Sequence, residues 1–190
     1  MFRTLLLLGS LWFTASLWAQ TGPRITLSVS NEQVSLPMTR FAPFHPGLEL
    51  TYTAAAVETS YGSRGWQASA GGYFHGFPTQ GAYLRGAYQW QWQPIPQLGL
   101  SVAPGIGYLH TWTAQPVYWP NEAGVYEEVN NWGRPEVMAE VGFGIALWPQ
   151  NRLSPTLGYR FAVEAPFSTV IPFLPRNFYQ IGLTYQLPSS

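Results

Sequence analysis

The 190-residue chain contains no cysteine, no lysine and no aspartate. Without cysteine it cannot form disulfides, zinc–thiolate sites or iron–sulfur clusters, and thiol catalysis is excluded. Charged residues make up only 9% of the chain, whereas soluble domains average about 25%. The nine basic residues, all arginine, balance nine glutamates, so the net charge is zero. The basic footprint of a nucleic-acid-binding protein is absent, and we expect no nucleic-acid partner.

Long apolar runs are also lacking. The apolar stretch 4–19 is shorter than the roughly 20 residues that a membrane-spanning helix needs. Its basic start at Arg3, its leucine-rich centre and its final Ala19 are typical of a secretory signal peptide. We therefore predict a cleaved signal peptide at 1–19 and a single exported domain at 20–190. An uncleaved N-terminal anchor is the alternative.

The pattern that recurs after residue 20 is alternation with a period of two. Seventeen prolines and 19 glycines interrupt the chain too often for long helices. The clearest alternation covers 82–93, where Leu84, Tyr88 and Trp90 share one face and Arg85 lies on the other. Such alternation predicts strands. It is repeated clearly in three further segments and more weakly in four: 137–147, 156–164 and 178–187, then 24–30, 48–58, 66–76 and 98–113.

The composition of the two strand faces favours a membrane barrel over a soluble one. A water-facing surface carries roughly 25–35% charged residues, a level that this chain hardly reaches. One face is apolar, and the other is rich in glycine, alanine, serine, threonine and glutamine, as in a barrel whose apolar face meets lipid. We therefore predict an all-β fold, an eight-stranded antiparallel up-and-down transmembrane β-barrel. The alternative is a secreted soluble barrel that holds a hydrophobic ligand.

Five charges within the predicted strands fall on the polar face. They are Glu49, Arg85, Glu140, Arg160 and Glu164. Unpaired charges in a narrow lumen would be costly, so we expect these two cations and three anions to form a paired network there. The alternative is that some lie in water at strand ends, Glu49 and Glu164 in particular.

The predicted connections alternate in length, which indicates an orientation. The segments 60–65, 94–97 and 149–153 are short, whereas 31–47, 114–134 and 166–176 are long. The exception is 77–80, which is short although it falls among the long connections. Membrane barrels have short periplasmic turns and long extracellular loops, so we place both termini in the periplasm. Aromatic residues gather near both ends and predict two interfacial belts. Trp66, Trp90, Trp92 and Trp148 lie near the short turns, and Phe77, Trp112, Phe167 and Tyr179 near the long loops.

The last strand carries a resemblance to a known class. Residues 180–187, QIGLTYQL, resemble the C-terminal assembly signal of bacterial outer-membrane barrels, with Leu187 in place of the usual terminal aromatic. The segments 39–50, 107–112 and 166–175 are similar to those of small uncharacterised outer-membrane barrels of Bacteroidota. This resemblance implies a bacterial outer-membrane location, contact with outer-membrane lipids and lipopolysaccharide, and insertion by the barrel-assembly machinery. It implies no activity.

Candidate chemistry is limited to three histidines. His45, His75 and His110 all fall near the predicted extracellular end. Converging imidazoles could bind a metal ion or act as bases; the alternative is three loop or interfacial histidines with ordinary hydrogen bonds. We predict no catalytic residue, no bound metal and no cofactor.

The predicted role is therefore structural or surface-binding, through loops whose extracellular ligand is unknown. An eight-stranded barrel is filled by side chains, so a wide pore is not expected. A narrow solute path past Arg85, Glu140 and Arg160 is one alternative. Another is a lipid A hydrolase of the kind that uses a His–Ser–Glu arrangement, although Thr111 and Trp112 follow His110 and Ser168 lies in a different loop.

Overall fold

The computed structural model describes residues 20–37, 44–75, 79–113, 115–129, 133–167 and 171–188. Within these residues the fold is all-β, and no helix is long and apolar enough to cross a membrane. Eight long strands form the barrel wall, as predicted. They are β2 (Arg24–Val34), β3 (Pro46–Thr53), β5 (Gly62–Phe74), β6 (Thr79–Ile95), β7 (Leu98–Thr113), β10 (Arg134–Leu147), β11 (Leu153–Ala165) and β12 (Leu174–Gln186). The predicted signal peptide lies outside the described residues and stays a prediction.

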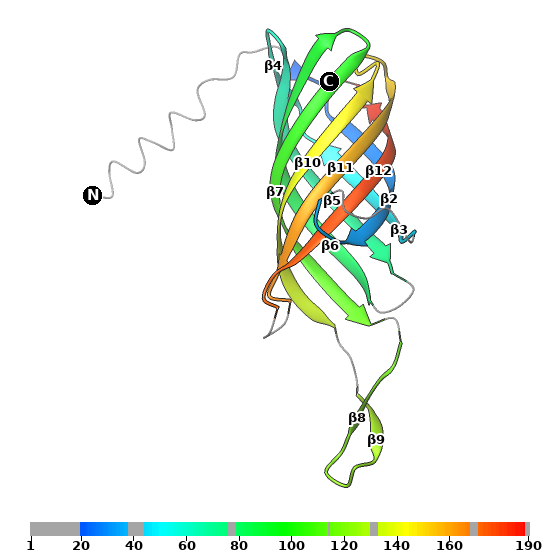
Figure 1. The fold of residues 1–190 in the computed structure, drawn as a ribbon. Coiled ribbons are helices and arrows are strands. Elements are labelled where there is room, and N and C mark those ends of the chain that lie inside the picture. The colour runs from blue at the N-terminus through cyan, green and yellow to red at the C-terminus, as the bar shows by residue number, and fades with distance from the viewer. Residues whose placement is uncertain are drawn as a thin grey trace, which may run out of the picture.

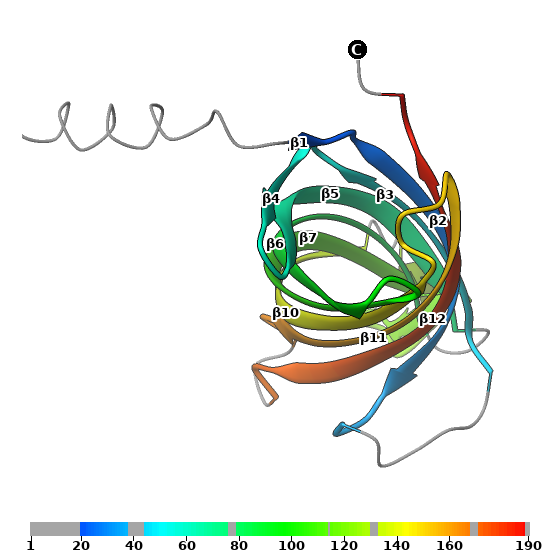
Figure 2. The same ribbon diagram turned by 90° about the horizontal axis from the view of Figure 1, so that it is seen from above.

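Each wall strand pairs antiparallel with its neighbours along the chain, and β12 pairs with β2 to close the barrel. Figure 2 shows the closed ring of strands from above. Closure leaves no unpaired edge among the wall strands, which is the arrangement a bilayer demands of a spanning sheet. Two short strands, β1 (Gln20–Thr21) and β4 (Ala56–Thr59), pair with each other, and β4 also pairs with β5.

The two ends of the barrel differ in the length of their connections. At the short-turn end, 60–61, 96–97 and 148–152 join adjacent strands. At the long-loop end, the connection between β7 and β10 contains a separate hairpin of β8 (Val117–Pro120) and β9 (Tyr126–Val129). Figure 1 shows this hairpin projecting away from the barrel. The predicted pattern of connection lengths is confirmed, including its exception, the short connection from β5 to β6 at the long-loop end.

The apolar side chains point outward and the charged ones inward. Leu84 is 62% exposed and Leu183 44% exposed on the outer surface, whereas Arg160 is 1% exposed within the barrel. The side chains of Arg85 and Glu140 are likewise enclosed. This polarity is the reverse of that in a soluble barrel, where the apolar face fills the core, and it suits lipid.

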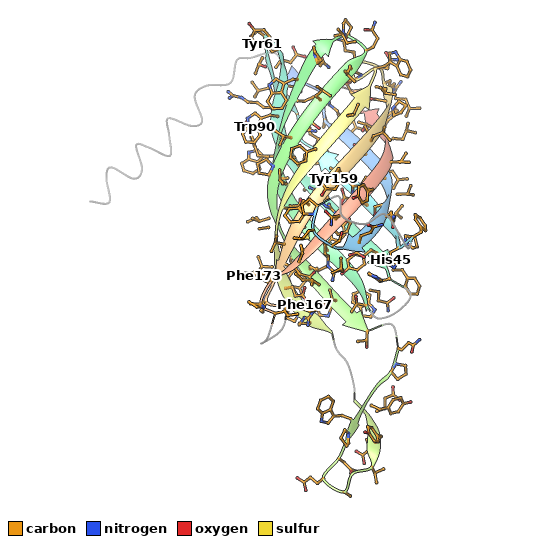
Figure 3. The ribbon with its side chains drawn as sticks, in the orientation of Figure 1. His45, Tyr61, Trp90, Tyr159, Phe167 and Phe173 are labelled. Carbon is orange, nitrogen blue, oxygen red and sulfur yellow. The ribbon has the colours of Figure 1, made fainter. Side chains whose placement is uncertain are left out.

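Aromatic side chains mark the short-turn end of the outer surface. Trp66, Trp90, Trp92 and Trp148 are all exposed there, and Tyr88 packs edge-on against Trp66 and Trp90. Figure 3 shows Trp90 and Tyr61 near this end and Phe167 and Phe173 near the other. Such belts suit the two membrane–water interfaces. Phe77, predicted for the second belt, lies outside the described residues.

Candidate functional site

The lumen is filled in successive layers from the short-turn end to the long-loop end. The first layer is a polar cavity of about 140 Å³, lined mainly by small and amide side chains such as Thr26, Gln89 and Thr156. At the short-turn end of this cavity, the guanidinium of Arg24 donates to Gln91 Oε1 at 2.9 Å. Alternation along the strands places these short side chains inward, and their small size leaves the space.

The second layer, here called the inner charge cluster, consists of Glu49, Arg85, Glu140 and Arg160. Arg85 lies 2.8 Å from a carboxylate oxygen of both Glu49 and Glu140. Arg160 donates to Glu49 and lies 3.6 Å from Glu140. Two cations and two anions therefore balance within a buried space, where an uncompensated charge would be strongly unfavourable.

A hydrophobic layer, here called the aromatic layer, closes the lumen beyond this cluster. It consists of Tyr73, Tyr83, Leu109, Met138, Ala162 and Phe178, all 5% exposed or less. Phe178 packs edge-on between Tyr73 and Tyr83, with ring centroids 6.0 and 5.9 Å apart. Sequence reasoning missed this layer. Alternation places Tyr83 on the same face as Arg85, and Met138 on the same face as Glu140. It does not reveal which inward residues of different strands lie at the same level of the barrel.

The last layer, here called the rim charge cluster, contains Glu32, Arg134, Glu136, Glu164 and Arg176. Arg176 lies 2.7 Å from Glu32 Oε1 and donates at 3.0 Å to Glu164 Oε1. Arg134 pairs with Glu136, which also accepts a bond of 3.0 Å from the Thr111 hydroxyl. The cluster lies at the long-loop end, because its residues come from the loop-side halves of their strands.

Four of the five sequence-predicted charged residues thus lie together, and Glu164 lies in the separate rim charge cluster. The alternative that Glu49 and Glu164 lie in water is wrong, because they are 2% and 0% exposed. Sequence reasoning missed Glu32 and Arg176, because the predicted strand 24–30 ended before Glu32 and the predicted strand 178–187 began after Arg176. Extending the alternation by one inward position, from Ser30 to Glu32 and from Phe178 to Arg176, would have found them.

Two of the three histidines meet at the long-loop rim. The rings of His45 and His75 lie with centroids 3.4 Å apart, and His75 Nδ1 lies 2.9 Å from Glu32 Oε2. His110 does not join them. Its neighbour Leu109 points into the lumen, so alternation turns His110 outward, where its Nδ1 lies 2.9 Å from the hydroxyl of Tyr108.

Comparison with known proteins places the fold. No protein-family model matches the chain, and no curated protein sequence matches it. Neisserial surface protein A aligns over 89% of this chain and 99% of its own, with a TM-score of 0.61 and 8% identity. Ail, the attachment invasion locus protein of Yersinia pestis, aligns over 89% and 100%, with a TM-score of 0.53 and 12% identity. The outer membrane enzyme PagL aligns over 86% and 99%, with a TM-score of 0.51 and 11% identity.

The chain has the fold of the small outer-membrane β-barrels. At these identities the likeness concerns the fold alone, and one fold carries many functions. The matched structures include both a surface protein and an enzyme, so function must be argued from the residues of this chain.

Proposed function

We propose that the chain is an integral outer-membrane protein that binds a partner at the cell surface and conducts no solute. In this proposal the long-loop end faces outward, and both termini lie in the periplasm after removal of residues 1–19. Outer-membrane lipids and lipopolysaccharide surround the apolar face once the barrel-assembly machinery has inserted it. The proposal includes the resemblance of the sequence to small outer-membrane barrels of Bacteroidota.

The observation that carries the proposal is the aromatic surface of the β8–β9 hairpin. Tyr118, Trp119 and Tyr126 are 55%, 69% and 69% exposed on an element that projects from the barrel. Large exposed aromatic side chains are the commonest anchors of protein interfaces. The turn that presents them is braced by Asn121, whose Oδ1 accepts from the backbone amides of Ala123 and Val125 at 3.0 Å each.

The charge of the hairpin limits the class of partner. Glu122, Glu127 and Glu128 are exposed, and residues 115–129 contain no cation. Ail has been crystallised with sucrose octasulfate, a heparin analogue and a polyanion. An acidic hairpin would repel such a ligand, so the proposed partner of this chain is a protein with a neutral or basic surface.

The proposal predicts that cells displaying the chain adhere to immobilised basic proteins and not to heparin. Because Trp119 and Tyr126 supply the anchors, the double substitution Trp119→Ala and Tyr126→Ala should lower adhesion at least tenfold. Tyr61→Ala is the control, because Tyr61 is even more exposed, at 78%, but lies at the short-turn end. Equal adhesion by the double variant and the control would contradict the proposal.

Two alternatives are distinguished by other measurements. A solute path past Arg85, Glu140 and Arg160 would give single-channel conductance in planar bilayers. We expect no conductance, because the aromatic layer fills the lumen. A lipid A hydrolase would change the mass spectrum of lipid A on overexpression. PagL shares the fold and is an enzyme, but the outward-facing His110 lies beside Tyr108, and Ser168 is outside the described residues.

A further inference from the structure

Glu32, His45 and His75 form a compact group of potential metal ligands at the long-loop rim. Each offers one ligand atom, and these atoms lie within 4.8 Å of one another. They come from different parts of the chain. Glu32 lies near the end of β2, His45 precedes β3, and His75 follows β5. The pairing of β3 with both β2 and β5 brings them together.

The other contacts of His45 determine which of its nitrogens is available. His45 Nδ1 lies 2.9 Å from the backbone carbonyl of Glu32. A carbonyl oxygen only accepts, so Nδ1 carries the proton and Nε2 keeps its lone pair. Donation from the second ring nitrogen to a backbone carbonyl is the usual support of a metal-binding histidine. The backbone around it is fixed too, because Glu32 donates its amide to the His45 carbonyl at 2.9 Å.

Glu32 keeps one carboxylate oxygen for this group. Its Oε1 is engaged by Arg176 at 2.7 Å. Its Oε2 forms an ion-pair contact of 2.9 Å with His75 Nδ1, and neither of these two buried atoms has a further hydrogen-bond partner among the described residues. The ion pair therefore holds two potential ligand atoms side by side.

The charge of the rim favours a cation. The rim charge cluster contains three glutamates and two arginines, and the excess negative charge is not compensated by another arginine within the described residues around it. A bound metal ion would balance this charge. The inner charge cluster, with two of each sign, has no such excess.

We propose that Glu32, His45 and His75 bind a divalent transition-metal ion, zinc or copper. Two imidazoles and one carboxylate suit these ions, and three protein ligands leave a coordination position for water or an external group. Ligands at 2.0–2.1 Å in a tetrahedron lie roughly 3.3 Å apart, so binding would part His75 Nδ1 from Glu32 Oε2, which lie 2.9 Å apart. It would also turn the two imidazole rings out of their contact at 3.4 Å. The ion would then link the loop-side ends of β2, β3 and β5.

The test uses the refolded protein without an added histidine tag, stripped with chelator and titrated calorimetrically with zinc chloride. We expect one ion per chain, and a loss of affinity of at least 100-fold in both His45→Ala and His75→Ala. His110→Ala is the matched control, since it removes a histidine at the same end that lies outside the group, and it should bind like the unsubstituted protein.

A second readout guards against variants that fail to fold. Cu²⁺ bound to the unsubstituted protein should give an electron paramagnetic resonance spectrum with coupling to two nitrogens, reduced to one in either histidine variant. Absence of stoichiometric binding would overturn the proposal, as would equal affinity in all three variants. Glu32 and His75 would then form only an ion pair.

Discussion

At the residue scale, the contacts of the lumen arginines show why this cation suits a buried site. The guanidinium of Arg160 faces two carboxylates at its edge and stacks over Phe178 and Tyr83, at 4.2 and 4.8 Å from the ring centroids. Arg176 combines ion pairs with a stack over Tyr73 at 4.9 Å. A planar guanidinium can stack on a ring while its edge donates to two carboxylates, whereas a lysine ammonium has no such planar fork.

The sequence indicated which charges point inward but not which ones pair. Alternation assigns each residue to a face. The contact between Arg160 and Glu49 joins positions 111 residues apart, and it depends on the stagger between strands around the closed barrel. Nothing in the period of two specifies that stagger, so the separation of Glu164 from the inner charge cluster was not foreseeable.

The inner charge cluster predicts a large effect of a single substitution. Arg160→Met should lower the free energy of unfolding by about 3–5 kcal/mol, because Glu49 and Glu140 would then share only Arg85 in a buried space. Guanidinium unfolding in lipid vesicles, followed by tryptophan fluorescence, measures the change.

Arg64→Met serves as its control, because Arg64 is exposed and its loss should change stability little. Adding Glu49→Gln to Arg160→Met should recover part of the loss by restoring the charge balance. If the single variant were as stable as the control, the cluster would not have the structural role assigned to it.

At the element scale, β5 and β6 are matched by reciprocal contacts between tyrosine and glycine. Tyr73 is paired with Gly81, and Tyr83 with Gly71. A Cβ added at Gly81 would lie 2.7 Å from the Tyr73 ring, and one at Gly71 would lie 2.6 Å from the Tyr83 ring. Each ring thus covers a glycine of the neighbouring strand, a device that helps to fix strand register.

Strand ends were harder to predict than strand centres. The prediction for the first wall strand ended at 30, whereas β2 continues to Val34. Its last residues and the start of β12 include asparagine and glutamine on the outer face, which obscure the alternation. Asn177 is nevertheless buried, because its amide donates to Ser35 at 2.9 Å as the chain folds back over it. Such local cover is invisible in a pattern of polarity.

The glycine contacts yield a prediction for the β5–β6 pair. Gly81→Ala should lower the free energy of unfolding by about 1–3 kcal/mol through overpacking of the aromatic layer. Gly86→Ala on the same strand is the matched control, because its added Cβ would meet no atom closer than 4.0 Å. Equal stability of the two variants, measured by chemical unfolding in vesicles, would show that the aromatic layer tolerates the extra carbon.

At the scale of the whole molecule, the composition follows from placing apolar side chains on the outer surface and polar side chains in the lumen. An outer surface in lipid requires no charged residues. A lumen filled by side chains requires only a few, provided that its cations and anions pair with one another. A chain with 9% charged residues can therefore fold stably as a barrel. The fold and the two faces were predictable because they depend on alternation alone, whereas the order of layers in the lumen depends on the closed structure.

The central claim is that apolar side chains contact lipid, while the side chains next to them in sequence line a polar lumen. It is tested most directly by spin labels on single-cysteine variants, which are unambiguous because the chain has no native cysteine. Leu157 is exposed on the outer surface, and the adjacent Thr156 lines the polar cavity. In lipid vesicles, a label at 157 should be relaxed by oxygen and one at 156 by a water-soluble nickel complex. The reverse pattern, or equal access at both positions, would contradict the account.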